Sequence, residues 1–239
     1  MTTVTTVTTV TTVTTANLMR KEQETRMEQE KSMTMLMHEL TNALATAHLA
    51  IGSLGPTSAM RGRGYRAIDS MRVIIRRCSL SSEIEANALT LQHSPVDIQE
   101  LLQELCSHMP ADANILLTTA AELPDCKTDR QLLLVILSNL LDNAINYRVT
   151  ASVIEVSASP QSRGFVAGMQ MSVSNALGEA GAPDAEHVFK KYWRGPGATR
   201  CAGSGLGLYL SSLIANRLGG ELRYRPENST VRFELWLPI

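Results

Sequence analysis

The first residues of this chain that could do chemistry are a histidine, a carboxylate and an amide within one helical turn. His38 is followed by Glu39, and Asn42 lies four residues after the histidine, so all three would share one side of a helix. Apolar residues recur from Met33 to Leu54 at a step of about 3.5 residues, which is typical of a helix packed on another helix. His38 would point away from that seam. Taken alone, a surface histidine on a polar helix face is the commoner explanation.

A second candidate is a glycine-rich turn that opens a helix. Gly203, Gly205 and Gly207 alternate with Ser204 and Leu206. Backbone N–H groups of such a turn can approach a ligand closely, and the N-terminus of the following helix favours anions. The pattern indicates phosphate binding, although glycine-rich turns are common and the motif is weak by itself.

A third candidate is a row of amides. Asn139, Asn143 and Asn146 fall at i, i+4 and i+7 and form one stripe of a helix, with Leu140 and Leu141 on the other side. Amide oxygens are hard ligands that suit Mg²⁺, which binds together with phosphates and few protein groups. A polar surface stripe is the alternative.

The N-terminal part must position the histidine. Residues 1–16 form a low-complexity tail with four copies of Thr-Thr-Val. Residues 17–93 predict an antiparallel helical hairpin, with helices over 17–53 and 65–91 and a break at Gly52–Pro56. A lone hairpin cannot bury so long a seam, so two copies should form a four-helix bundle.

Residues 94–239 change in character and predict an α/β sandwich, one sheet covered on one face by helices. The fold class of the whole chain is therefore α+β. Helices are expected over 99–108, 129–147 and 204–218, and strands over 96–98, 115–119, 153–157, 169–173, 222–225 and 231–237. Residues 178–203 are expected to be irregular.

Composition excludes several classes of function. A formal net charge of −1 argues against nucleic acid as a partner. The four cysteines are widely spaced and predict neither a zinc site nor a disulfide framework. The longest apolar run, Leu132–Leu137, is far short of the ~18 residues of a membrane span. We therefore expect a cytoplasmic protein with no membrane span, whose sensor, if one exists, is another protein.

The motifs gain meaning from their order. The stretch from His38 to Asn42, the asparagine-rich helix, Val188–Arg194 and Gly203–Leu208 follow one another as in the transmitter module of sensor histidine kinases, part of the gyrase and histidine kinase ATPase superfamily. The resemblance extends from about Glu28 to Ile239. It implies an ATP-dependent kinase that forms a homodimer and passes a phosphoryl group to a response regulator receiver domain.

The resemblance also implies roles for the first group of residues. His38 would accept the phosphoryl group from ATP, Glu39 would remove the proton from the attacking imidazole, and Asn42 would position water for dephosphorylation of the partner.

For the nucleotide side, Asn143 would hold Mg²⁺ and the glycines would cradle the triphosphate. The complete set of implied nucleotide positions is Asn139, Asn143, Asn146, Tyr147, Asn175, Arg194, Gly203, Gly205, Leu206 and Gly207.

Two of these positions depart from the family pattern. Asn175 stands where the family has an Asp that accepts a hydrogen bond from adenine, and Asn146 replaces a usual Lys or Arg. The alternative function is therefore a non-catalytic histidine phosphotransfer or scaffolding protein with a degenerate ATP-binding domain.

Overall fold

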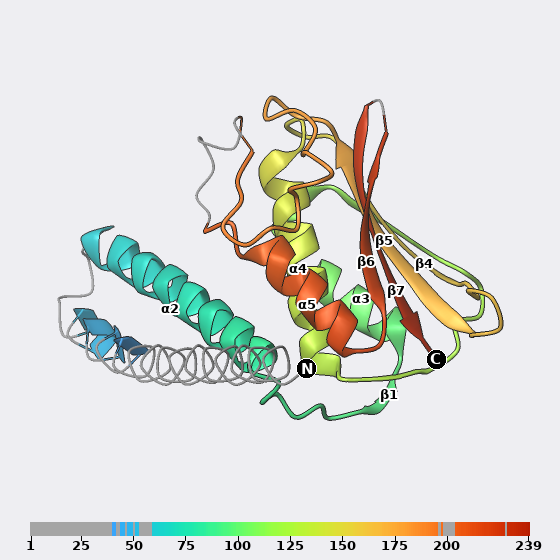
Figure 1. Ribbon diagram of the computed structural model, residues 1–239. Helices are drawn as coiled ribbons and strands as arrows, with labels where there is room; N and C mark the ends of the chain where they lie inside the picture. Colours follow the sequence, from blue (N-terminus) through green and yellow to red (C-terminus); the bar gives the residue numbers. More distant parts are fainter. Residues whose placement is uncertain are drawn as a thin grey trace, which may run out of the picture. The chain divides into compact units, whose positions relative to one another are not determined.

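The computed structural model describes residues 40, 41, 44, 45, 47–49, 51, 52, 59–195, 197, 204–227 and 229–239 (Figure 1). The chain divides into two compact units, Met1–Ala86 and Asn87–Ile239. His38, Glu39, Asn42 and Gly203 lie outside the described residues. The predicted tail and most of the first predicted helix lie outside them too, so the helical hairpin stays a prediction.

The first unit contains helix α2, Ala59–Glu85. The predicted helix over 65–91 is therefore right in type, but it begins and ends about two turns early. The chain leaves the helix at Asn87, which takes a left-handed φ of 55° that interrupts helical geometry. Ile68 and Ile75 are buried, whereas Met71 and Ile74 are exposed.

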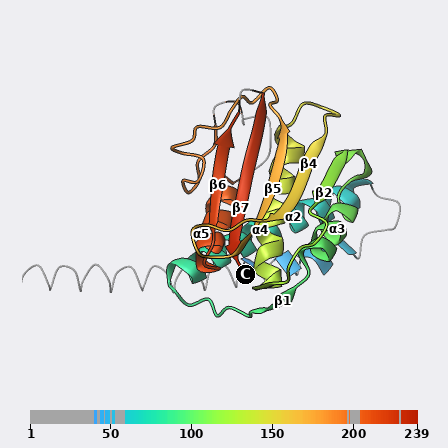
Figure 2. The ribbon, with the colours of Figure 1, turned by 90° about the vertical axis from the view of Figure 1, so that its right-hand side faces the viewer.

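The second unit is built on a five-stranded sheet of order β2-β4-β5-β7-β6 (Figure 2). Strands β2 and β4 are parallel, and the other neighbouring pairs are antiparallel. The bounds are β2 Ile115–Thr119, β4 Ile154–Pro160, β5 Gly168–Ala176, β6 Glu221–Pro226 and β7 Thr230–Pro238. Helices α3 Ile98–Ser107, α4 Arg130–Tyr147 and α5 Gly207–Arg217 cover one face of this sheet.

The core lies between the helices and the sheet. Helix α4 is apolar over most of its surface, and the side chains of Leu133, Ile136 and Leu137 are at most 1% exposed. Asp129 begins this helix because its Oδ1 accepts hydrogen bonds from the backbone N–H groups of Gln131 and Leu132, both at 3.1 Å. The apolar face of helix α4 is thus part of the core, and its first turn is capped.

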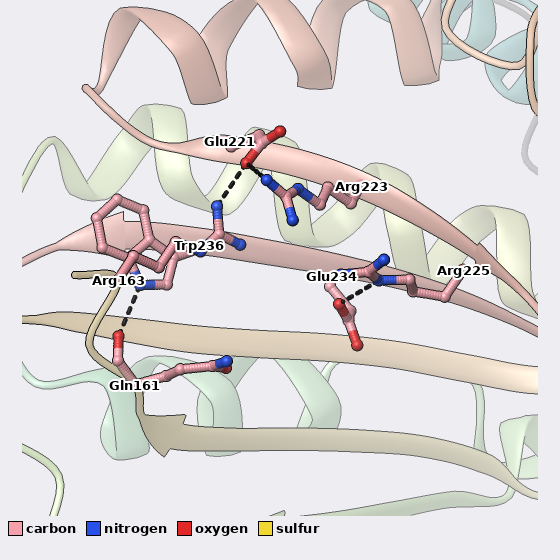
Figure 3. A network of polar contacts seen from close by, with 7 residues as sticks. All are labelled: Gln161, Arg163, Glu221, Arg223, Arg225, Glu234 and Trp236. Atoms are coloured by element: carbon pink, nitrogen blue, oxygen red, sulfur yellow. Dashed lines mark hydrogen bonds and ion pairs between the residues drawn. The ribbon is translucent and has the colours of Figure 1, made fainter.

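The sheet face that the helices leave open is polar and carries an ionic network (Figure 3). Arg163 donates to Glu221 at 2.5 Å and lies over the ring of Trp236. Trp236 donates its indole N–H to the backbone oxygen of Gln161 at 2.7 Å. These contacts attach the turn between β4 and β5 to β7 and to the edge strand β6.

One local prediction is wrong in its bounds, and one short strand was not predicted. The strand expected over 96–98 lies at Ser94–Val96, because Asp97 is the N-cap of α3 and ends the extended segment. Its antiparallel partner β3, Cys126–Thr128, was not predicted, since a strand of three residues carries no periodic signal. Over the described residues, no helix is both long and apolar enough to cross a membrane.

Candidate nucleotide-binding site

The predicted amide stripe lies on α4 but its members differ in environment. Asn139 is 3% exposed, Asn143 is half-buried and Asn146 is exposed. The stripe therefore turns outward along the helix, from the core toward Tyr147 at the helix end. Only its middle and last members are open to a ligand.

Asn139 joins the two helices that carry the predicted nucleotide motifs. Its side-chain Nδ2 donates to the backbone oxygen of Gly207 at 3.3 Å and to Oγ of the fully buried Ser211 at 3.2 Å. Both partners belong to α5. The side chain thus acts inside the domain, where it fixes the start of α5 against α4.

The N-terminus of α5 is suited to an anion. Its N-cap residue, Leu206, is 1% exposed, and no side chain among the described residues caps the helix end. The first-turn N–H groups have no intrahelical acceptors, and the helix dipole places partial positive charge there. A phosphate is the kind of group that such an end binds.

Gly205 is required by protein packing, which is a different reason from the one the sequence suggested. It has a φ of 70°, and a Cβ added there would lie 2.6 Å from the carbonyl carbon of Tyr192 and 2.8 Å from the oxygen of Trp193. Tyr192 itself has a φ of 62°. The glycine-rich turn and the segment around Tyr192 thus pack backbone against backbone, in a conformation that an L side chain adopts only with strain.

Lys191 is a cation at this site that the sequence argument missed. Its Nζ lies 5.5 Å from the ring centroid of Tyr209, in the first turn of α5, and 5.7 Å from that of Tyr192. Cation–π attraction at this range holds the ammonium close to the helix N-terminus. Arg194, the predicted cation, is exposed. The adjacent pair Lys190-Lys191 was the signal in the sequence, but nothing there showed which lysine faces α5.

The end of β5 meets the end of α4. Residues 148 and 177 form an isolated bridge, and a Cβ on Gly178 would collide with the backbone oxygen of Tyr147. Asn175, near the end of β5, is 6% exposed and donates its Nδ2 to the oxygen of Ala176 at 2.9 Å. The structure thus brings the segment after Asn175 next to Tyr147, and the roles predicted for both residues stay predictions.

Irregular residues after β5 are anchored by apolar packing at their centre. Val188 is 3% exposed, and the ring of Phe189 makes an edge contact with Phe233 of β7 at 6.2 Å between centroids. Tyr224 of β6 packs on the same Phe233 ring. This aromatic anchor holds the segment that leads to Lys191 and Tyr192.

A mixed sheet with helices on one face, a glycine at 205 just before α5 and an amide-bearing α4 are the features expected of an ATPase-like domain. Comparison with known proteins agrees. Residues 128–239 match the family described as histidine kinase-, DNA gyrase B- and HSP90-like ATPase. The match covers the sheet strands β4 to β7 and helices α4 and α5.

Curated relatives extend the match to the N-terminal unit. The chain is 26% identical over 220 residues to the swarming motility regulation sensor protein RssA of Serratia marcescens, covering 86% of this chain and 45% of the relative. It is 24% identical over 202 residues to the sensor protein kinase PmrB of Pseudomonas aeruginosa, covering 80% and 42%. The chain thus spans less than half the length of these relatives.

Solved structures share the fold. Full-length ShkA, crystallised in complex with AMPPNP, superposes with a TM-score of 0.71 at 24% identity, over 87% of this chain and 45% of that one. The histidine kinase AdeS of Acinetobacter baumannii gives a TM-score of 0.59 at 16% identity, over 84% and 94%. Together with the family match and the curated relatives, the comparisons support a histidine kinase transmitter module with an ATPase catalytic domain.

Proposed function

We propose that this chain is the core of a two-component histidine kinase. The second unit binds ATP, His38 accepts the γ-phosphoryl group, and an aspartate of a response regulator receiver domain then takes it. Dephosphorylation of that regulator, with Asn42 positioning the water, is part of the same proposal. Glu39 acts as the base for the imidazole of His38.

The observation that carries the proposal is the N-terminus of α5, which no side chain of the described residues caps, beside helix α4. Asn139 joins the two helices, so the first-turn N–H groups of α5 and the side chain of Asn143 keep a constant relation. Such a fixed arrangement is what phosphoryl transfer needs, since catalysis there rests on positioning and on neutralising charge. Gly205 lies just before this helix end, and Gly207 is the first residue of α5.

Magnesium fits the residues present at one position. Asn143 is half-buried one helical turn beyond Asn139, and its amide oxygen is a hard neutral ligand. Mg²⁺ would neutralise phosphate charge when bound. Lys191 and Arg194 supply the protein's own positive charge, and Lys191 is held toward α5 by the ring of Tyr209. They offset the absence of a cation at Asn146.

One observation favours the alternative, a phosphotransfer or scaffolding protein with a degenerate ATP-binding domain. Asn175 has no charge, and its Nδ2 is engaged with the oxygen of Ala176. Its Oδ1 can accept one hydrogen bond from an adenine amino group, but without the charge assistance that an aspartate gives. Nucleotide affinity decides between the two functions.

The deciding experiment is incubation of the full chain with γ-labelled ATP and Mg²⁺. Label should enter the wild type, be absent from His38→Ala, and be stable to alkali and labile to acid, as a phosphoramidate is. An unlabelled wild type at millimolar ATP would favour the alternative.

A second experiment separates the two halves of the site. Asn143→Asp places a charge beside the phosphates and should abolish labelling, yet His38 should still accept phosphate in reverse from a phosphorylated receiver domain. Asn42→Ala should do the opposite, keeping the labelling and slowing dephosphorylation of the receiver. If Asn143→Asp labels as fast as wild type, the magnesium assignment is wrong.

A further inference from the structure

The segment 87–93, called the linker below, follows α2 and is the first stretch of the second unit. Its residues are mostly exposed, and only Leu89 and Leu91 are half-buried. After it, β1 pairs with β3 in antiparallel register, with Ser94 opposite Thr128. From β1 onward the chain is part of the second unit's framework, so the linker is the last stretch that could move freely.

Two side chains of the second unit hold the linker down. Oδ2 of Asp129 accepts a hydrogen bond from the backbone N–H of Gln92 at 2.9 Å. Nη2 of Arg217 donates to the backbone oxygen of Leu89 at 3.1 Å. Beyond the end of the β1–β3 pairing, the carboxylate of Asp129 accepts the hydrogen bond that a main-chain oxygen of a longer β3 would accept. Arg217 adds a second attachment, at a residue that is closer to α2 along the chain.

The two attachments sit at the rear ends of the helices that carry the nucleotide motifs. Asp129 is the N-cap of α4, whose other end carries Asn143 and Tyr147. Arg217 is the last residue of α5, whose first residue is Gly207. The linker is therefore fastened to the same rigid pair of helices, at the ends away from the predicted phosphate site.

The hydrogen-bond donors of the Arg217 side chain are only partly satisfied. Its Nε is buried and has no hydrogen-bond partner among the described residues. An unpaired buried donor offsets part of what the bond to Leu89 contributes. A mostly exposed segment held by two such bonds belongs to the part of a protein that opens locally before the core does.

We propose that Asp129 and Arg217 form a releasable clasp that sets the length of the free tether between the two units. With the clasp closed, the free chain runs from Glu85 to Leu89, which can span at most about 14 Å. With it open, the free chain runs from Glu85 to Ser94, which can span about 30 Å. Both residues are positioning residues, because they act through the linker.

The first measurement is amide hydrogen exchange in the full chain. Asp129→Asn keeps an acceptor for the N-cap but replaces Oδ2 with an NH₂ group that cannot accept from Gln92. Arg217→Gln is too short to reach Leu89. Each variant should speed exchange of the Gln92 amide, the linker N–H that the clasp protects, on the order of tenfold, and the double variant more.

Matched controls exist for both substitutions. Asp97→Asn changes the N-cap of α3, which accepts from Glu100 and does not contact the linker. Arg130→Gln removes an exposed arginine of the first turn of α4, which pairs with Glu104 of α3. Neither control should alter exchange in the linker. Unchanged exchange in the double variant overturns the clasp.

The second measurement concerns reach. Spin labels at Asp69→Cys of α2 and Thr118→Cys of β2, both exposed positions, report the separation of the two units once the accessible native cysteines are replaced. The distribution of separations should widen in the double clasp variant and keep its width in the two controls. Equal widths in all proteins would show that the clasp does not limit the tether.

The consequence for catalysis rests on the proposed function. Doubling the tether lowers the effective concentration of one unit at the other, so transfer to His38 should slow about threefold while nucleotide affinity stays unchanged. Transfer at the wild-type rate or faster, with faster linker exchange, contradicts the tether role. A wild type that is never phosphorylated by ATP contradicts the proposed function alone. Hydrogen exchange and the spin-label distances still test whether the clasp exists.

Discussion

The amide of Asn139 donates to Oγ of Ser211 at 3.2 Å, and both side chains are almost completely buried. One polar contact inside an apolar layer therefore joins α4 to α5. A buried polar group that keeps its partner costs little, whereas a partner left unpaired is expensive. The contact makes the relative position of the two helices specific.

Replacing Asn139 with alanine should lower the free energy of unfolding by about 1–3 kcal/mol, because Ser211 and the oxygen of Gly207 lose a buried donor. Nucleotide affinity should fall with it, since the start of α5 is no longer fixed. Denaturant unfolding and calorimetric titration measure both. Gln131→Ala, at an exposed position of α4, is the control and should change neither. A loss of stability with unaltered affinity would refute the positioning role.

Gly205→Ala should disturb the glycine-rich turn more than its φ alone explains. The methyl group would meet the backbone of Tyr192 and Trp193, so one of the two segments must shift. We expect loss of labelling from ATP and altered amide chemical shifts around Lys191.

The matched control for Gly205→Ala is Gly164→Ala. Gly164 has a φ of 60°, but nothing lies within 4 Å of an added Cβ. It isolates the cost of a left-handed φ, about 1 kcal/mol, from the cost of the collision. If both variants label equally, the backbone contact with Tyr192 has no role.

Acid should weaken the ionic network on the open sheet face. The pKa of Glu221 is lowered because Arg223 donates to its carboxylate at 2.7 Å, and Arg163 adds a second contact. A carboxylate with a lowered pKa stabilises the fold above its unfolded-state pKa, and the stabilisation disappears as pH falls through the folded-state value.

Glu221→Gln should therefore reduce stability at pH 7 and narrow the difference in stability between pH 7 and pH 3. Since the side chain of Glu221 is 42% exposed, solvent screens the pair and the effect should be modest. Denaturant unfolding at both pH values measures it. Glu122→Gln, an exposed position between β2 and β3, should keep the wild-type pH dependence. If the stability of Glu221→Gln depends on pH as that of the wild type does, the ionic network does not contribute to acid sensitivity.

Assembly is tested on the first unit. Ile74 of α2 is 42% exposed and Leu40 is 47% exposed, as expected if a second copy covers them in a four-helix bundle. Ile74→Asp and Leu40→Asp should each dissociate a dimer by burying an unpaired charge. Light scattering at micromolar concentration measures the mass, with Asp69→Asn on α2 as the control. A monomeric wild type would contradict the predicted bundle.

Local patterns in the sequence were sufficient for the framework of the second unit. The apolar pattern over 129–147 predicted helix α4, and alternation predicted β4 and β5, although each of these strands continues three residues beyond its predicted end. These signals are strong because burial of one face or of a whole helix repeats with a fixed period along the chain. The order of the motifs predicted a histidine kinase transmitter module, and the comparisons support that prediction.

The contacts that make the site specific depend on the tertiary structure. The sequence showed three asparagines in one stripe, but only the packing of α4 against α5 turned Asn139 inward and left Asn143 half-buried. It showed a flexible glycine at 205, but only the fold placed the backbone of Tyr192 against it.

The same holds for Asp129 and Gln92, which are far apart along the chain and meet because β1 pairs with β3. Periodicity records which face of an element is buried, and this is a property of neighbours in sequence. Which distant backbone fills the space beside a given residue depends on how whole elements pack, and no local pattern carries that information.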